Sequence, residues 1–347
     1  MAQDRSKIKV GGLKILEEGA GVVSSSAKGD LRLRAGICSP LARNRINLTF
    51  LTHVAGAFGA EAYSVFCTEL TAGMTSFTLV KSDDADACRV SLHAPICIIS
   101  LYPHDKRADI KGAFLRALAQ ARVMVLSLAS SPSAISAVIS AHAKKRAVER
   151  LFSFFEFPSY ATPEEFYAIQ PPPEDLMREV VAAYQEKVIK IYQLIELTDL
   201  DLWCVSIPTS MVLENLGTAL MALGRQGLRI PFLVALPGAE DRFVCTFSTA
   251  RERQEEVASL LDAHISVISL QRLSPVAALF FHGPHFGDRY GIADTLMQAL
   301  ERVQVEPLAL SCAVSSISVM LKNEYLARAL EELSQTFADQ SKSGQIG

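Results

Sequence analysis

The stretch LARNRINLTFL (Leu41–Leu51) returns 182 residues later as LGRQGLRIPFL (Leu223–Leu233), with its first and last leucines, an arginine and a phenylalanine in place. A second pair lies at the same offset, VMVLSLASSPSAISAVI (Val123–Ile139) and VEPLALSCAVSSISVML (Val305–Leu321). Self-similarity at one fixed spacing in two distant places indicates a repeated architecture. The sequence therefore predicts two copies of one unit of roughly 180 residues.

Composition excludes several classes of protein. The 347 residues include 34 Lys and Arg against 37 Asp and Glu, so no basic tract offers the positive surface that nucleic-acid binding needs. Half of the residues are apolar, which is enough for buried cores. Seven cysteines without a CxxC pair predict reduced thiols, with neither disulfides nor a zinc site. The N-terminal residues lack the apolar core of a signal peptide, and 123–143 is typical of buried strands rather than a membrane span, so we expect a cytoplasmic protein.

The segment between the copies is interrupted by proline. The run Pro171–Pro173 forbids both helix interior and sheet ladder there, which predicts a linker over residues 158–187. Its second part, Glu174–Lys187, has acidic residues early and a lysine at its end, as a helix with a favourable macrodipole should.

Each copy shows the order strand, helix, strand, strand, helix twice. The last instance predicts strands at Val276–Phe281, Glu306–Ser311 and Ile317–Leu321, and helices at Tyr290–Val303 and Glu324–Phe337. One further strand makes such a βαββα series ferredoxin-like. The first instance is the least regular, because its second helix should fall near Thr71–Ser82, which looks more like a strand.

The predicted fold class is therefore α+β, with four small modules in tandem as an internal duplication. Their predicted bounds are 1–93, 94–157, 188–264 and 265–347. A module of about 70 residues is marginal alone, and its bare strand edges need a neighbour. We therefore expect the modules to pair.

The last module resembles the second ACT domain of aspartokinases. The residues that match its motif in register are Gly283, Gly291, Ile292, Ala293, Ala299, Leu300, Ser311, Ile317, Ser318 and Val319. Two positions depart from it, because Val314 replaces a glutamate and Glu306 an asparagine. The first module resembles a first ACT domain at Leu41, Ala42, Ile46 and Asn47. The likeness covers most of the chain and implies tandem ferredoxin-like (βαββαβ) ACT modules that bind an amino acid where modules meet, and a homodimer.

Loops before helices supply the first candidate ligand contacts. His282, His285 and Asp288 precede the helix of the last module, and His104 and Asp105 precede that of the second. Unpaired N–H groups at a helix start can receive a carboxylate, and Asp105 could take an α-amino group. Two histidines and an aspartate could instead bind a metal, and all of these residues could be solvated turn residues.

Strands supply the remaining candidates. Asn47 and His53 are candidates for polar contacts at a module interface, or ordinary edge-strand residues. Ser130, Ser131 and Ser311 follow serine and threonine positions of the family, although serines also cap turns for local reasons. The predicted ligand-binding set is Asn47, His53, His104, Asp105, Ser130, Ser131, His285, Asp288 and Ser311.

Short motifs of catalysis are missing from the sequence. It has no GxGxxG, P-loop, HExxH, GxSxG or CxxC pattern, and KVGG at residues 9–12 is only a faint echo of the aspartokinase phosphate-binding signature. We therefore expect a regulatory protein that is not an enzyme, without catalytic residues, metal or cofactor. It would bind a small amino acid where ACT modules meet and change the chain's contacts with a partner, a biosynthetic enzyme being one candidate, with a link to aspartate-family metabolism. The alternative is an oligomerisation or docking scaffold that has lost its pockets.

Overall fold

The computed structural model describes most of the chain. The described residues are 7–26, 33–56, 61–81, 88–169, 190–191, 193–265, 268–283, 289–313 and 316–339. The helix predicted at Glu174–Lys187 lies outside these residues.

Twelve of the described strands form one closed antiparallel sheet, in the order β10-β12-β11-β6-β7-β5-β2-β4-β3-β14-β15-β13. Their bounds are β2 (Gly12–Ser26), β3 (Phe50–Val54), β4 (Ala62–Glu69), β5 (Cys88–Tyr102), β6 (Val125–Ser130), β7 (Ile135–Ser140), β10 (Gln193–Pro208), β11 (Leu233–Pro237), β12 (Arg242–Ala250), β13 (Ser269–His282), β14 (Ala309–Ala313) and β15 (Ser316–Lys322). Short parallel pairs join β1 (Ile8–Lys9) to β8 (Phe155–Glu156) and β9 (Lys190–Ile191) to β16 (Ala338–Asp339).

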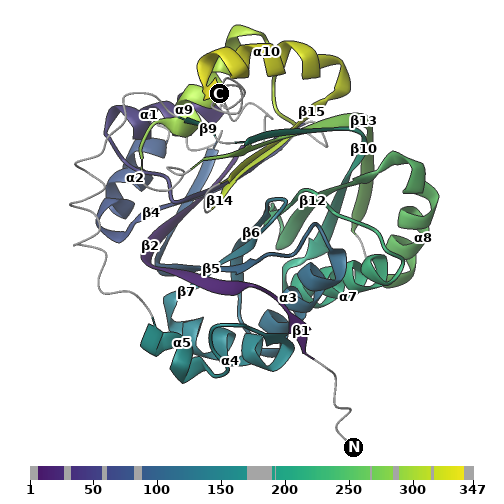
Figure 1. Cartoon of the computed structure of the whole chain (residues 1–347). Coiled ribbons are helices and arrows are strands. Elements are labelled where there is room, and N and C mark those ends of the chain that lie inside the picture. Colours follow the sequence, from purple (N-terminus) through teal and green to yellow (C-terminus); the bar gives the residue numbers. More distant parts are fainter. Residues whose placement is uncertain are drawn as a thin grey trace, which may run out of the picture.

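The helices lie outside the closed sheet in two groups (Figure 1). One group contains the π-helix η1 (Leu33–Cys38), α1 (Ser39–Arg43), α2 (Gly73–Val80), α9 (Ile292–Arg302) and α10 (Leu326–Thr336). The other contains α3 (Ala108–Gln120), α4 (Lys144–Phe154), α5 (Pro163–Ile169), α7 (Val212–Arg225) and α8 (Gln254–His264). The fold is thus mixed α/β with a large antiparallel sheet, as the α+β prediction required at this level.

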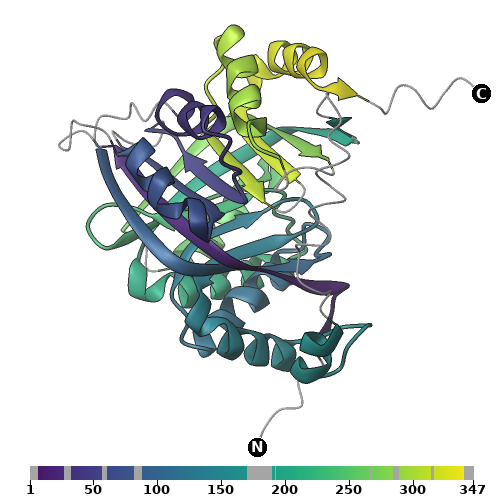
Figure 2. The same cartoon turned by 90° about the vertical axis from the view of Figure 1, so that its left-hand side faces the viewer.

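The sheet divides into four units that share long strands. Unit 1 is the second half of β2, η1 with α1, β3, β4, α2 and the first half of β5. Unit 2 is the first half of β2, the second half of β5, α3, β6, β7 and α4. Units 3 and 4 repeat this plan with β10 and β13 as the shared strands. Figure 2 shows β2 and β5 side by side along their length.

A register shift marks where each shared strand passes from one unit to the next. β2 and β5 shift around Gly19, next to Glu18 at φ 56°. β10 and β13 shift around Leu200, next to Asp199 at φ 52°. Such bulges increase the local twist and redirect a strand. Residues 12–16 therefore lie in the sheet of unit 2, and β5 crosses the predicted boundary between residues 93 and 94.

Edge strands of different units pair and close the sheet. β3 of unit 1 pairs with β14 of unit 4, so that His53 lies opposite Leu310. β6 of unit 2 pairs with β11 of unit 3. We call these two junctions seam 1–4 and seam 2–3. Burial of the edge backbone by a neighbour is what small open sheets need.

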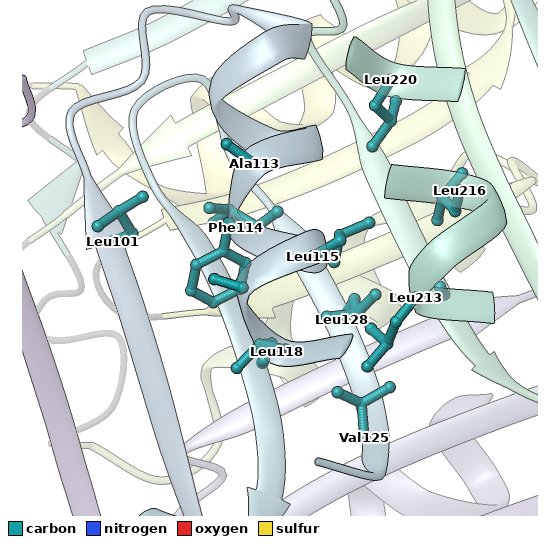
Figure 3. Packing of buried hydrophobic residues seen from close by; sticks show 14 of the residues in the cluster. Leu101, Ala113, Phe114, Leu115, Leu118, Val125, Leu128, Leu213, Leu216 and Leu220 are labelled. Carbon is teal, nitrogen blue, oxygen red and sulfur yellow. The ribbon is translucent and has the colours of Figure 1, made fainter. Parts of the chain in front are cut away.

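Apolar side chains fill both faces of the sheet. Under the helices of units 2 and 3, Phe114, Leu115 and Leu118 of α3 belong to one buried cluster with Leu213 and Leu216 of α7, and Leu115 points toward α7 (Figure 3). Residues that alternate with the helix-facing ones point into the closed sheet. There Thr52 and Ser127 share a hydrogen bond of 2.8 Å between their hydroxyl oxygens, and the Ser127 hydroxyl is 3.0 Å from the Ala235 carbonyl oxygen.

One local prediction was wrong. The strand-like segment near Thr71–Ser82 contains helix α2, whose hydroxyls bond back to the preceding turn: Ser76 donates to Ala72 and Thr78 to Met74. Packing against the sheet overrides the strand propensity of this segment. At the start of the predicted linker and helix segment, Tyr160 packs on Phe152, 5.7 Å between ring centroids, and α5 follows.

Candidate functional site

A pocket lies at seam 1–4. It has an empty volume of about 460 Å³, open mouth included. One wall comes from unit 1, through η1, α1 and the loop before β3, and the other from unit 4, through the start of α9 and from β14. The site therefore exists only where the two halves of the chain meet.

The polar end of the pocket is the N-terminus of α9. Gly291 caps this helix at φ 86°, a left-handed conformation that favours glycine. The first N–H groups of a helix have no partner within it and carry partial positive charge. Gly291, Ile292 and Ala293 line the pocket together with Arg289. This end of the pocket therefore suits a carboxylate.

An ion pair crosses the seam beside the pocket. Nε of Arg34, on η1, lies 3.1 Å from Oδ1 of Asp294, on the first turn of α9, and the same guanidinium is 2.5 Å from Oε2 of Glu301. These hydrogen bonds raise the pKa of Arg34. The three side chains connect η1 to α9, and the pocket-lining carboxylate of Asp294 gives the site an acidic group as well as a basic one.

The rest of the wall is apolar or carries thiols. Leu41, Ile46 and Leu48 line it from unit 1, and Cys38 and Cys312 from both units. Burial raises the pKa of Cys312 to about 12 and that of Cys38 well above its usual value. Both thiols are therefore protonated near neutrality and poor nucleophiles. The pocket thus suits binding of a small molecule with charged groups at one end and an apolar part.

Seam 2–3 contains the residues that correspond to the pocket residues at the offset of 182, but the space equivalent to the pocket is filled there. Lys111 stands where Ala293 lies in the pocket, Gly112 where Asp294 lies, and Ser130 where Cys312 lies. Lys111 is fully buried, and its Nζ donates to the Ile230 carbonyl oxygen. Burial, with a smaller contribution from Lys106, lowers the pKa of Lys111 well below its usual value.

The two helices of seam 2–3 pack at backbone contact. A Cβ at Gly112 would lie 2.6 Å from the Gly217 carbonyl oxygen, and a Cβ at Gly224 would lie 2.4 Å from the Asp109 nitrogen. At seam 1–4 the helices carry the Arg34 and Asp294 side chains instead. This difference explains why one seam is closed and the other has a pocket.

His104 is buried at seam 2–3, in the loop before α3. The Lys106 backbone N–H donates to its Nδ1 at 3.0 Å, so the neutral ring carries its proton on Nε2, which donates to the Ser130 hydroxyl at 3.2 Å. Burial, with a smaller contribution from the charge of Lys111, lowers the pKa of His104 to about 2. Asp105, next to it, is exposed at φ 49°.

The other predicted site residues are spread over the fold. Asn47 lies between Ile46 and Leu48, which line the pocket. His53 is buried on β3 with Nδ1 2.8 Å from the Ser64 hydroxyl, and burial lowers its pKa to about 4.

The predicted serines do not line the pocket. Ser311 points into the closed sheet, since its neighbour Leu310 packs under the helices. Ser131 caps a turn by accepting from the Ala134 backbone N–H at 3.1 Å. His285 and Asp288 lie outside the described residues.

The pocket residues were missed because most are apolar or small. Cys38 and Cys312 belong to no motif, and Gly291, Ile292 and Ala293 were matched as positions of the family and not as ligand contacts. The available signal was the pairing of the two copies, in which Lys111 and Ala293 occupy equivalent positions. Within the described ranges, no three His, Cys, Asp or Glu side chains are grouped as metal ligands would be.

The sequence matches no family model and no curated protein. The structure is similar to that of the aspartate kinase from Synechocystis, with a TM-score of 0.76 over 94% of this chain at 13% identity. This chain spans 56% of that kinase.

Two further structures match only part of this chain. The regulatory subunit of the aspartate kinase from Thermus thermophilus covers 42% of it, at a TM-score of 0.38 and 16% identity, and 98% of that subunit is matched. The Clostridium acetobutylicum aspartate kinase covers 45%, at 0.38 and 14% identity, and 37% of that kinase is matched. These scores are too low to support an argument.

The prediction that the chain is not an enzyme is contradicted by the first of these matches. Over 94% of its length the chain has a fold that occurs in an enzyme, an aspartate kinase. The prediction rested on the absence of short catalytic motifs from the sequence, but at 13% identity two chains can share a fold without sharing such motifs.

No helix among the described residues is long and apolar enough to cross a membrane.

Proposed function

We propose that the chain is an amino acid-binding regulatory region of the aspartate kinase type, and that a small amino acid binds in the pocket at seam 1–4. The observation that supports this most is the composition of the pocket: a helix N-terminus and Arg289 for a carboxylate, Asp294 for an ammonium group, and an apolar wall. The fold similarity to an aspartate kinase supports a link to aspartate-family metabolism.

The four units are, in this proposal, ferredoxin-like ACT modules. In unit 1 the chain order β2, helix, β3, β4, α2, β5 has the spatial order β5-β2-β4-β3, which is the arrangement of a βαββαβ sheet. Units 2 and 4 take their last strand from the preceding long strand, β2 or β10.

The ligand would act by linking two units. A ligand changes an equilibrium only by binding one arrangement better than another. Because the pocket walls come from units 1 and 4, a bound amino acid contacts both units and favours the arrangement in which they are paired. A change in the arrangement of the two halves of the chain would then signal ligand binding to the protein of which the chain is a part, or to a protein that it contacts.

A calorimetric and thermal-shift screen of the twenty amino acids tests this proposal, with lysine and threonine first. We expect binding of a small subset. Ala293→Leu places a larger side chain in the pocket and should weaken amino acid binding at least about tenfold. The added atoms occupy space that the ligand needs, and the pocket walls can make room for both only by losing their own packing.

Gln298→Leu is the matched control, since Gln298 is exposed on the same helix. It should bind the ligand as the unsubstituted chain does. Absence of binding by any amino acid, or equal binding by both variants, would contradict the proposal, and the first result would favour the scaffold alternative.

A further inference from the structure

The duplication permits a residue-by-residue comparison of the two seams. Arg107 corresponds to Arg289, Lys111 to Ala293, and Ile230 to Leu48, each at the offset of 182 residues. All three residues of the second set line the pocket at seam 1–4. The backbone agrees: the Leu228 N–H donates to the Leu223 carbonyl, as the Ile46 N–H donates to the Leu41 carbonyl.

At seam 2–3 the Lys111 side chain takes the space that is open at seam 1–4. It starts from the first turn of α3, in unit 2, and ends on the Ile230 carbonyl oxygen of unit 3. It is fully buried. One side chain therefore spans the seam from helix to strand entry, as a ligand of the open pocket would.

The closure around Lys111 involves backbone from both units. The Ile230 N–H donates to the Lys106 carbonyl oxygen at 2.9 Å, and the backbones of Arg107 and Arg229 form an isolated antiparallel β-bridge. The carbonyl that receives Lys111 is thus held in place by the loop that precedes α3. The site thus has a fixed acceptor, and the buried Lys111 side chain fills the path to it.

From this geometry we infer that Lys111 is a built-in occupant of seam 2–3, whose alkylamine group fills and holds shut a second ligand site. Removal of the side chain leaves a cavity that takes a primary alkylamine. If the proposed function is right, each unsubstituted chain binds one amino acid, at seam 1–4 alone.

Lys111→Ala tests the inference without any amino acid ligand, so its result is independent of the proposed function. The full-length variant is expected to unfold at a lower temperature than the unsubstituted chain. n-Propylamine, which matches the deleted atoms, should restore several degrees in a saturable manner. Tetramethylammonium, a cation without an N–H donor, should not. Lys145→Ala, at an exposed position on α4, is the control variant and should respond to neither compound.

Lys111→Gly provides a second variant, since it lacks one more carbon. Its preferred compound should shift from n-propylamine to n-butylamine. If Lys111→Ala is too unstable to purify, the same compounds are present during refolding and the recovered fraction is measured. Equal responses to n-propylamine and tetramethylammonium, no response to either, or the same response in Lys145→Ala would overturn the inference.

Discussion

Replacing Gly112 by alanine is expected to lower the free energy of unfolding by about 1–3 kcal/mol, the usual cost of forcing extra atoms into a packed contact. In an open helix the same change would stabilise the protein by up to about 1 kcal/mol, because alanine is the better helix former. Here the new Cβ would lie 2.6 Å from the Gly217 carbonyl oxygen and 2.7 Å from the Met221 nitrogen. Both atoms are backbone of α7 and cannot rotate away, so α3 and α7 must separate.

Gly36→Ala is the matched control. Gly36 is also helical, and a Cβ there would meet nothing within 4 Å. It should be neutral or slightly stabilising. Chemical denaturation of both variants measures the difference, and a Gly112→Ala variant as stable as Gly36→Ala would show that the helix contact at seam 2–3 is looser than the structure has it.

Acid is expected to destabilise the fold through two buried histidines. The pKa is about 2 for His104 and about 4 for His53, against a usual value of 6.5. Between its folded-state pKa and 6.5, each histidine binds a proton in the unfolded chain but not in the folded chain. The stability lost through these two histidines is therefore small well above pH 6.5 and grows as the pH decreases below it. Near pH 5 each histidine then costs about 2 kcal/mol, or about 4 kcal/mol together, at 1.36 kcal/mol per pKa unit.

Denaturation at a series of pH values measures this loss. His104→Gln and His53→Gln should each be less stable near neutrality, since a hydrogen bond to a serine is disturbed, but should flatten the dependence on pH between about 6.5 and 5. His142→Gln, at an exposed position, should leave the slope unchanged. Unchanged slopes in both buried variants would contradict the assignment.

Much of the fold was predictable because the relevant signals are local. The predicted helix Tyr290–Val303 contains α9, and the predicted strand Ile317–Leu321 lies within β15, since apolar periodicity there is unbroken. α2 was not predictable in this way, because Phe77, Thr78 and Val80 favour strands in isolation and only the surrounding sheet makes them helical. The sharing of β2 between units 1 and 2 also depends on contacts between residues some 90 positions apart, for example Gly12 with Tyr102.

The candidate site was harder, because it is made by pairing of the first unit with the last. Arg289 and Cys38 come together only through the closure of the sheet. Polar residues attracted attention in the sequence, and two of them, His104 and Ser130, bond to each other at the filled seam 2–3 and not in the pocket. The two seams differ in the size of the side chains between their helices. Gly112 permits close contact of α3 with α7, whereas the Asp294 and Arg34 side chains lie between α9 and η1.

The closed sheet constrains how copies of this chain can assemble. Each of its twelve described strands has a neighbour on both sides within the same chain, including β3 with β14 and β6 with β11. Main-chain groups that would otherwise recruit a foreign strand are already used. The homodimer expected from the sequence stays a prediction, and if it forms, the twelve strands of the closed sheet do not pair between its subunits, so that assembly and the pairing of these strands can vary independently.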